Sequence, residues 1–169
     1  MPTLIRTPMS YFVSYAHHDA SLVDPLLEEL DVQMKPSQRF NHSLWLDQDR
    51  IIVGRLWKQR ISEALRECDY GLLLLSPAFF GSPFVTTVEL PRFVGGRKPC
   101  IPVLLAPVNI GLIDTKGLDA YQFFALATQN TRHTKSFDEC KGREKRLYCE
   151  QLFAKIEARI EADRCGVTV

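Results

Sequence analysis

The sequence has no apolar run long enough to cross a membrane and no large excess of charge of one sign. Its longest apolar stretch, Gly71 to Leu75 with its flanks, is far shorter than the about 20 residues of a membrane span. The N-terminal residues lack the apolar region of a signal peptide. The 21 basic and 20 acidic side chains nearly cancel, so no extended nucleic-acid-binding surface is expected. We therefore expect a soluble, cytoplasmic protein that binds neither membranes nor nucleic acids.

Close cysteine pairs are missing as well. The five cysteines are Cys68, Cys100, Cys140, Cys149 and Cys165. They form no C-x-x-C pair, and several lie in apolar stretches. This pattern favours buried thiols in a reducing compartment over a disulfide framework, and it argues against a metal site built from cysteine.

Several motifs of nucleotide-binding and hydrolytic enzymes are absent. No G-x-G-x-x-G follows a predicted strand and no Walker motif is present, so neither a dinucleotide-binding Rossmann site nor a P-loop is supported. The absence of G-x-S-x-G removes the commonest serine hydrolase of this topology. A response regulator is also excluded, because the central predicted strand ends at Ser76, where such a protein carries its phosphorylated aspartate.

Short apolar runs alternate with helical patterns along the whole chain. The strands expected from these runs are 10–15, 43–46, 70–75, 100–108 and 121–126. The last expected helix has an apolar stripe formed by Cys149, Leu152, Phe153, Ile156 and Ile160. Such alternation is typical of a parallel sheet covered by crossover helices. We expect one α/β domain over residues 1–169, with a structured core over about 8–163.

Two serines are followed by proline where helices are expected to begin. In Ser76-Pro77 and Ser82-Pro83 the serine would cap the helix and the proline would occupy its first position. The second helix is expected to run over residues 83–90, because Pro91 removes a donor and blocks its continuation. Glu89 would then lie near the end of a short helix, at a site that we expect to be partly open.

The segment after the first predicted strand carries His17, His18 and Asp19. Adjacent histidines in a loop point apart and no further ligands cluster with them, so a metal site is not expected. Ligands of doubly wound sheets bind at the carboxyl ends of the strands, where this segment lies. Two roles stay open for Asp19, at the rim of a binding site or as N-cap of the next helix. In that helix we expect Pro25 in the first turn.

Three stretches resemble the Toll/interleukin-1 receptor (TIR) domain, and among its members the bacterial TIR proteins, in their order and approximate spacing. They are YFVSYAHHD (11–19), LWLDQDRIIVGRLWKQRISEALRECDYGLLLLS (44–76) and SPFVTTVEL (82–90). The resemblance covers nearly the whole chain. It implies a flavodoxin-like fold with a five-stranded parallel sheet and helices on both faces. It also implies that residues 48–54 form the BB loop, through which TIR domains associate with one another.

The same resemblance implies a set of site residues. Enzymatically active TIR domains cleave the bond between nicotinamide and ribose in NAD+, and their essential glutamate lies in the helix after the third strand; by position it is Glu89. Many members carry a tryptophan four residues before that glutamate, but here this position holds Val85, and Phe84 is the aromatic residue expected to contact the substrate. The other expected substrate-binding residues are Ser14, Tyr15, Ala16, His17, Asp47 and Arg50. The expected assembly residues of the BB loop are Asp49, Ile51, Ile52, Val53 and Gly54.

The implied chemistry requires little beyond one carboxylate. Nicotinamide bonded to ribose is cationic, so it leaves as a neutral molecule and needs no general acid, unlike the leaving oxygen in glycoside hydrolysis. The ribose gains oxocarbenium character as the bond breaks, and a negative charge or hydrogen bonds to the ribose hydroxyls stabilise that state. Glu89 can provide either. Capture by water gives ADP-ribose and capture by a nucleophile of the same molecule gives a cyclic ADP-ribose; the sequence leaves both products open.

Three hypotheses about function follow. The first is an NAD+ hydrolase or cyclase that needs no cofactor or metal, is activated by self-assembly and acts as the effector of a bacterial defence response. The second is a non-enzymatic scaffold that recruits other TIR domains. The third is a domain that senses NAD-like nucleotides without cleaving them. A sensor module, fused or separate, is an expected partner, and the chain is either a whole protein or a domain excised from a longer one.

Overall fold

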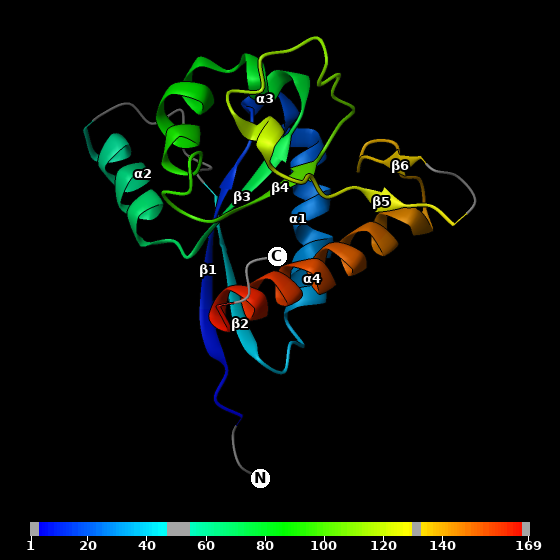
Figure 1. The fold of residues 1–169 in the computed structure, drawn as a ribbon. Helices are drawn as coiled ribbons and strands as arrows, with labels where there is room; N and C mark the ends of the chain where they lie inside the picture. Colours follow the sequence, from blue (N-terminus) through cyan, green and yellow to red (C-terminus); the bar gives the residue numbers. More distant parts are fainter. Residues whose placement is uncertain (1–3, 47–54, 130–132, 167–169) are drawn as a thin grey trace.

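The computed structural model describes residues 4–46, 55–129 and 133–166 (Figure 1). In this part of the chain four strands form a sheet with the order β2-β1-β3-β4. They are β1 (Thr7–Ser14), β2 (Phe40–Trp45), β3 (Tyr70–Leu75) and β4 (Cys100–Leu104). Every neighbouring pair in this sheet is parallel, which confirms the predicted α/β class.

The central strand β3 has the bounds that its sequence predicts. All six of its residues are buried, because it lies between β1 and β4 and is covered on both faces, as an unbroken apolar run indicates. The bounds of the other strands differ from the prediction. Both β1 and β2 begin three residues earlier, and β4 ends at Leu104, before the predicted end at residue 108.

The predicted fifth strand, 121–126, is reduced to a single bridge beside β4. Among the described residues the parallel sheet therefore has four strands, and the prediction of five was wrong. Phe124 N–H donates to the carbonyl of Pro102 at 2.8 Å, and Leu104 N–H donates to the carbonyl of Phe124 at 2.9 Å. The ladder cannot continue towards residue 122 because Pro102 has no N–H to donate. On the other side, Phe137 N–H already donates to the carbonyl of Leu104 at 3.0 Å.

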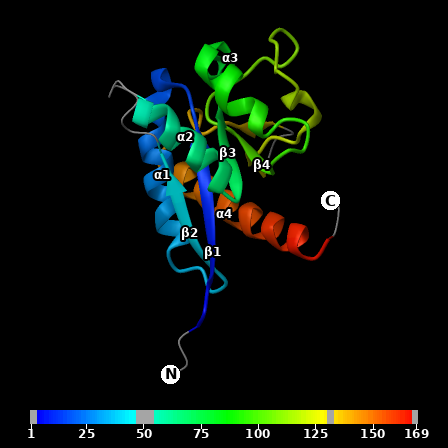
Figure 2. The ribbon, with the colours of Figure 1, turned by 90° about the vertical axis from the view of Figure 1, so that its left-hand side faces the viewer.

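Helices cover both faces of the sheet (Figures 1 and 2). The α-helices are α1 (Ala20–Met34), α2 (Arg55–Glu67), the five-residue α3 (Pro77–Gly81) and α4 (Arg143–Arg164). The short elements are η1 (His17–Asp19), η2 (Val85–Glu89), η3 (Leu90–Arg92), η4 (Leu118–Ala120) and the paired strands β5 (Leu126–Ala127) and β6 (Thr134–Lys135). Pro25 lies in the second turn of α1, so its predicted place in the first turn is wrong. None of the helices described is long and apolar enough to span a bilayer.

Alternating side chains of the strands divide into two apolar clusters. The cluster beneath α1 and α4 takes Tyr11, Val13, Leu72 and Leu74 from β1 and β3. The cluster beneath α2 and α3 takes Phe12, Leu73 and Leu75 from the same strands. Successive residues of a strand point to opposite faces. Ser14 therefore lies on the face of Phe12, towards α2 and α3.

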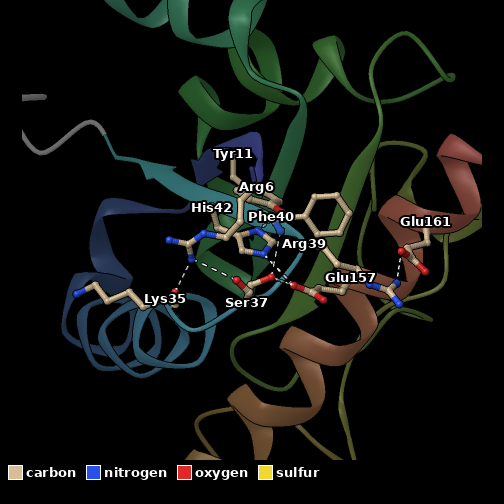
Figure 3. Close-up of polar contacts among 9 residues, drawn as sticks. All are labelled: Arg6, Tyr11, Lys35, Ser37, Arg39, Phe40, His42, Glu157 and Glu161. Carbon is tan, nitrogen blue, oxygen red and sulfur yellow. Dashed lines mark hydrogen bonds and ion pairs between the residues drawn. The ribbon is translucent and has the colours of Figure 1, made fainter. Parts of the chain in front are cut away.

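A polar network ties the edge strand β2 to α4 (Figure 3). The His42 side chain, only 1% exposed, lies 2.8 Å from the Tyr11 hydroxyl through Nδ1 and 3.2 Å from the Glu157 carboxylate through Nε2. The Ser37 hydroxyl also donates to Glu157. Burial lowers the pKa of His42, and the hydrogen bond with Glu157 opposes this effect. The imidazole is thus held between two partners inside the core.

The cysteines behave as buried thiols, as predicted. All five are free, and four of them, Cys68, Cys100, Cys140 and Cys149, are buried, whereas Cys165 is exposed. Burial raises the pKa of Cys100 and of Cys140 to about 11. Since the thiolate is the reactive form, these two thiols are inert near neutral pH.

Candidate active site

Two serines mark the edge of the sheet at which β1 and β3 end. Ser14 is the last residue of β1, and Ser76 directly follows β3; both are buried. The two parallel strands run towards α3, at the top of Figure 1. The carboxyl ends of the strands are where open α/β sheets bind ligands.

Glu89 approaches this edge from the segment that follows α3. Glu89 is 0% exposed, and Ser14 Oγ donates a hydrogen bond to Glu89 Oε2 at 2.5 Å. The expectation of a partly open site is therefore wrong for this conformation. The reason is local. Val85, four residues before Glu89, and Leu90, directly after it, are both buried, so this turn packs closely on the sheet and the Glu89 side chain points towards it. A carboxyl group withdrawn from water requires such hydrogen bonds.

The helix predicted over residues 83–90 is present, but Glu89 ends a π-turn within it, η2. The N–H of Leu90 donates to the carbonyl of Val85, five residues earlier. The Thr87 hydroxyl donates to the carbonyl of Pro83 at 2.6 Å, a side-chain contact of the kind that bends helices. Pro91 has no N–H to continue the ladder, and the chain proceeds as the 3-10 helix η3. π-turns are rare and occur frequently at functional sites.

A second serine–carboxylate hydrogen bond lies at the same edge. Ser76 Oγ donates to Asp19 Oδ2 and accepts from Phe79 N–H at 3.0 Å, as the Ser-Pro signal for a helix cap predicts. Asp19 occupies the N-cap position of α1, but its side chain makes no capping hydrogen bond. The capping role predicted as one alternative for Asp19 is therefore wrong. His18, whose side chain is 86% exposed, places Nδ1 3.4 Å from Asp19 Oδ1.

The structure separates some of the residues expected to bind substrate. Those it describes are Ser14, Tyr15, Ala16, His17 and Phe84. Ser14 contacts Glu89 directly, and the half-buried Phe84 packs against the cluster beneath α2 and α3, on the same face. Tyr15 belongs to the cluster beneath α1 and α4, on the opposite face. Ala16 is buried and His17 is exposed.

The remaining predicted residues lie outside the described part of the chain. They are Asp47 and Arg50, expected to bind substrate, and Asp49, Ile51, Ile52, Val53 and Gly54, expected in assembly. Their predicted roles stay predictions.

The two serine–carboxylate pairs were not predicted as pairs. The partners are 75 residues apart in Ser14–Glu89 and 57 residues apart in Ser76–Asp19. The available signal was that each serine lies within one residue of the end of a predicted strand, since strand ends in a parallel sheet meet at one edge. Chain position alone does not select which carboxylate meets which serine.

Other concave or polar places lie apart from this edge. A cavity of about 490 Å³ lies at the amino ends of β3 and β4 and is lined by Tyr70, Cys100, Arg159 and Asp163, among others. Its charged groups have partners within the chain. Asp163 accepts from Tyr70 at 2.7 Å and from Arg159 at 2.9 Å, Lys98 donates to the carbonyl of Cys68 at 2.6 Å, and Asp69 accepts from the Ser10 hydroxyl at 3.0 Å. Among the residues described, no three histidine, cysteine, aspartate or glutamate side chains are grouped so as to hold a metal.

A family model described as "TIR domain" matches residues 12–140. The matched region begins in β1 and ends before α4, and it contains both serine–carboxylate pairs. No curated protein matches the chain.

Proposed function

Since the chain belongs to the TIR domain family, we propose that it is an NAD+ glycohydrolase or cyclase in which Glu89 is the catalytic residue. The observation that supports this proposal is the carboxyl group of Glu89, buried and hydrogen-bonded to Ser14 where β1 ends. Burying a carboxylate costs free energy. A carboxylate that is buried at this cost, at the edge where sheets of this kind bind ligands, is better explained by a role in chemistry than by a role in packing.

In the proposed reaction the bond between ribose C1′ and the nicotinamide nitrogen breaks, and the bonding electron pair leaves with nicotinamide, which becomes neutral. Positive charge develops on the ribose, and the carboxylate of Glu89 stabilises it more than it stabilises the bound substrate. Water or a nucleophile of the same molecule then forms a bond to C1′. When water reacts, its proton passes to Glu89 or to solvent. The products are nicotinamide with ADP-ribose or with a cyclic ADP-ribose.

Glu89 is fully buried, so the proposed reaction requires a conformation in which NAD+ reaches it. We propose that association of several TIR domains produces this conformation, since domains of this family associate with one another. A sensor module, fused or separate, would start the assembly. The cellular role proposed for this activity is that of a cytoplasmic effector in bacterial defence.

The same burial favours a second candidate function, a non-enzymatic scaffold. A glutamate that is 0% exposed and bonded to a strand end also fits a residue that only holds η2 against the sheet. In that case the chain would recruit other TIR domains without consuming NAD+.

The deciding experiment is incubation with NAD+ at high protein concentration, with nicotinamide measured by chromatography. Glu89→Gln is nearly isosteric and its amide oxygen can still accept from Ser14, so the variant should fold and nicotinamide release should collapse. Glu67→Gln, at a side chain that is 72% exposed, is the matched control and should keep the parent activity. Near-parent turnover by Glu89→Gln would remove Glu89 from the chemistry. A parent that binds NAD+ without releasing nicotinamide would be a sensor, and one that does neither would be a scaffold.

A further inference from the structure

The two serine–carboxylate pairs form a reciprocal brace between the same two regions of the chain. Ser14, at the end of β1, donates to Glu89, which lies beyond β3. Ser76, at the end of β3, donates to Asp19, which lies beyond β1. Each region thus contributes one donor and one acceptor. The first bond holds Glu89, and the second holds Ser76, directly before the segment that carries Glu89.

The braced segment, residues 77–92, has little capacity to hold its own shape. It consists of α3, with five residues, and a continuous helical run over residues 83–92 that contains η2 and η3. Helices this short are marginal without tertiary contacts. Its buried apolar residues, such as Phe79, Val85 and Leu90, attach it to the sheet, but apolar burial is non-directional. Hydrogen bonds have strict geometry, so the two braces fix the direction in which the segment leaves the sheet.

We propose that Asp19 and Ser76 are positioning residues for Glu89. This inference rests on the proposed function. The Ser76–Asp19 bond fixes the start of α3 against the start of α1, and Ser76 also caps α3 through Phe79 N–H. With that end released, η2 shifts and the Glu89 carboxylate moves relative to the ribose. Misplacement of a reacting group by about 1 Å can lower a rate on the order of a hundredfold.

A second serine in the chain provides a matched control. Ser37 is buried, donates to the carboxylate of Glu157 and accepts from Phe40 N–H, three residues later, at 3.2 Å. Ser76 makes the same pair of bonds, with Asp19 and with Phe79 N–H. Ser37→Ala and Ser76→Ala therefore delete the same interactions, one at the junction of β2 with α4 and the other beneath the segment of Glu89.

The test is to measure kcat and KM for nicotinamide release together with Tm for both variants. Ser76→Ala should lower kcat roughly ten- to a hundredfold with little change in KM, whereas Ser37→Ala, with a comparable loss in Tm, should keep kcat within about twofold of the parent. Ser76→Thr retains a capping hydroxyl and should restore most of kcat. If Ser76→Ala does not fold, Asp19→Asn, which replaces a charged acceptor by a weaker neutral one, should still lower kcat several-fold.

Equal kcat in Ser76→Ala and Ser37→Ala, or no recovery in Ser76→Thr, would overturn the positioning role. Amide hydrogen exchange of residues 85–92 separates this outcome from failure of the proposed function. If the parent releases no nicotinamide, the enzymatic proposal fails, and the brace is then judged by exchange alone. Faster exchange in Ser76→Ala than in Ser37→Ala supports the brace, and equal exchange rejects it.

Discussion

Gly71 of β3 lies directly beneath the aromatic ring of Phe93. A Cβ atom built at Gly71 would lie 2.5 Å from Phe93 Cε1, a distance at which the ring or the strand must move. Phe93 is 0% exposed and directly follows η3. The missing side chain in the central strand therefore leaves room for the ring that attaches the far end of the segment carrying Glu89.

Gly71→Ala should destabilise the fold by about 1–3 kcal/mol through overpacking against Phe93. The free energy of unfolding in urea measures the effect. Gly81→Ala is the control, since a Cβ at Gly81 meets nothing within 4 Å, and it should be neutral or slightly stabilising. Equal stability of the two variants would mean that Phe93 does not press on β3 in solution.

Ser14→Ala should lower both stability and the proposed activity. It deprives the buried Glu89 carboxyl of a hydrogen bond at 2.5 Å, which costs about 1–3 kcal/mol, and it removes the contact that orients the carboxylate. Tm and nicotinamide release report the two effects. Ser10→Ala, in the middle of β1, deletes a hydroxyl that donates to Asp69 Oδ2 at 3.0 Å and accepts from Asp69 N–H at 3.2 Å, both in exposed positions, and it should change neither by much. A Ser14→Ala protein that matches Ser10→Ala would contradict the assigned contact.

Stability should fall as the pH drops below about 6.5, because of His42. Burial lowers the pKa of His42 in the folded state, whereas the unfolded chain protonates near pKa 6.5. The unfolded state thus binds more protons in this range, and the contribution of His42, complete above about pH 6.5, is lost as the pH falls towards the folded pKa. The loss is about 1.4 kcal/mol for each pH unit between the two values.

Urea unfolding of the parent and of His42→Gln between about pH 7.5 and 5.5 measures this loss. The variant should show a flatter profile than the parent. His133→Gln, at an exposed histidine, should retain the parent profile. Parallel profiles for the parent and His42→Gln would assign the acid sensitivity to other groups, of which Glu157, Tyr11 and Arg6 surround the imidazole.

The specific activity should rise with protein concentration if assembly completes the site. Ile51, Ile52 and Val53 form an apolar run in the sequence, outside the described residues. Ile52→Asp should give a folded, monomeric and nearly inactive protein, because a charge in an intersubunit contact is costly to desolvate. Leu112→Asp, at an exposed leucine in the loop after β4, should stay active. Specific activity that is constant from dilute monomer upward would leave a self-contained enzyme.

The sequence predicts the interior of this fold better than its edges. The strand 70–75 is recognisable because a strand buried on both faces has no polar alternation, and Ser76 is recognisable as a cap because proline follows it. The prediction of a fifth strand over 121–126 was wrong because an apolar run carries no information about the strand with which it would pair. A hydrogen-bonded ladder cannot form there because Pro102 has no N–H to donate and the Leu104 carbonyl already accepts from Phe137 N–H.

For the candidate site, the position of Glu89 after the central strand was predictable, but its surroundings were not. Its full burial and its bond to Ser14 depend on a contact between residues 75 positions apart. The π-turn was not predictable from residue spacing, because its two buried residues, Val85 and Glu89, are four apart and also fit one face of an α-helix. The sequence left two roles open for Asp19, at the rim of a site or as the cap of α1, because no local feature shows that Ser76 binds its carboxylate.

The π-turn of η2 also affects how this chain is aligned with its relatives. A π-turn closes its hydrogen bond over one residue more than an α-turn does. Phe84, five residues before Glu89, therefore corresponds in space to a residue four positions before a glutamate that ends an α-helix. That is the position at which the resemblance to TIR domains expects a tryptophan. We therefore expect an alignment by structure to place a one-residue gap within 85–88 and to match Phe84, not Val85, to that tryptophan.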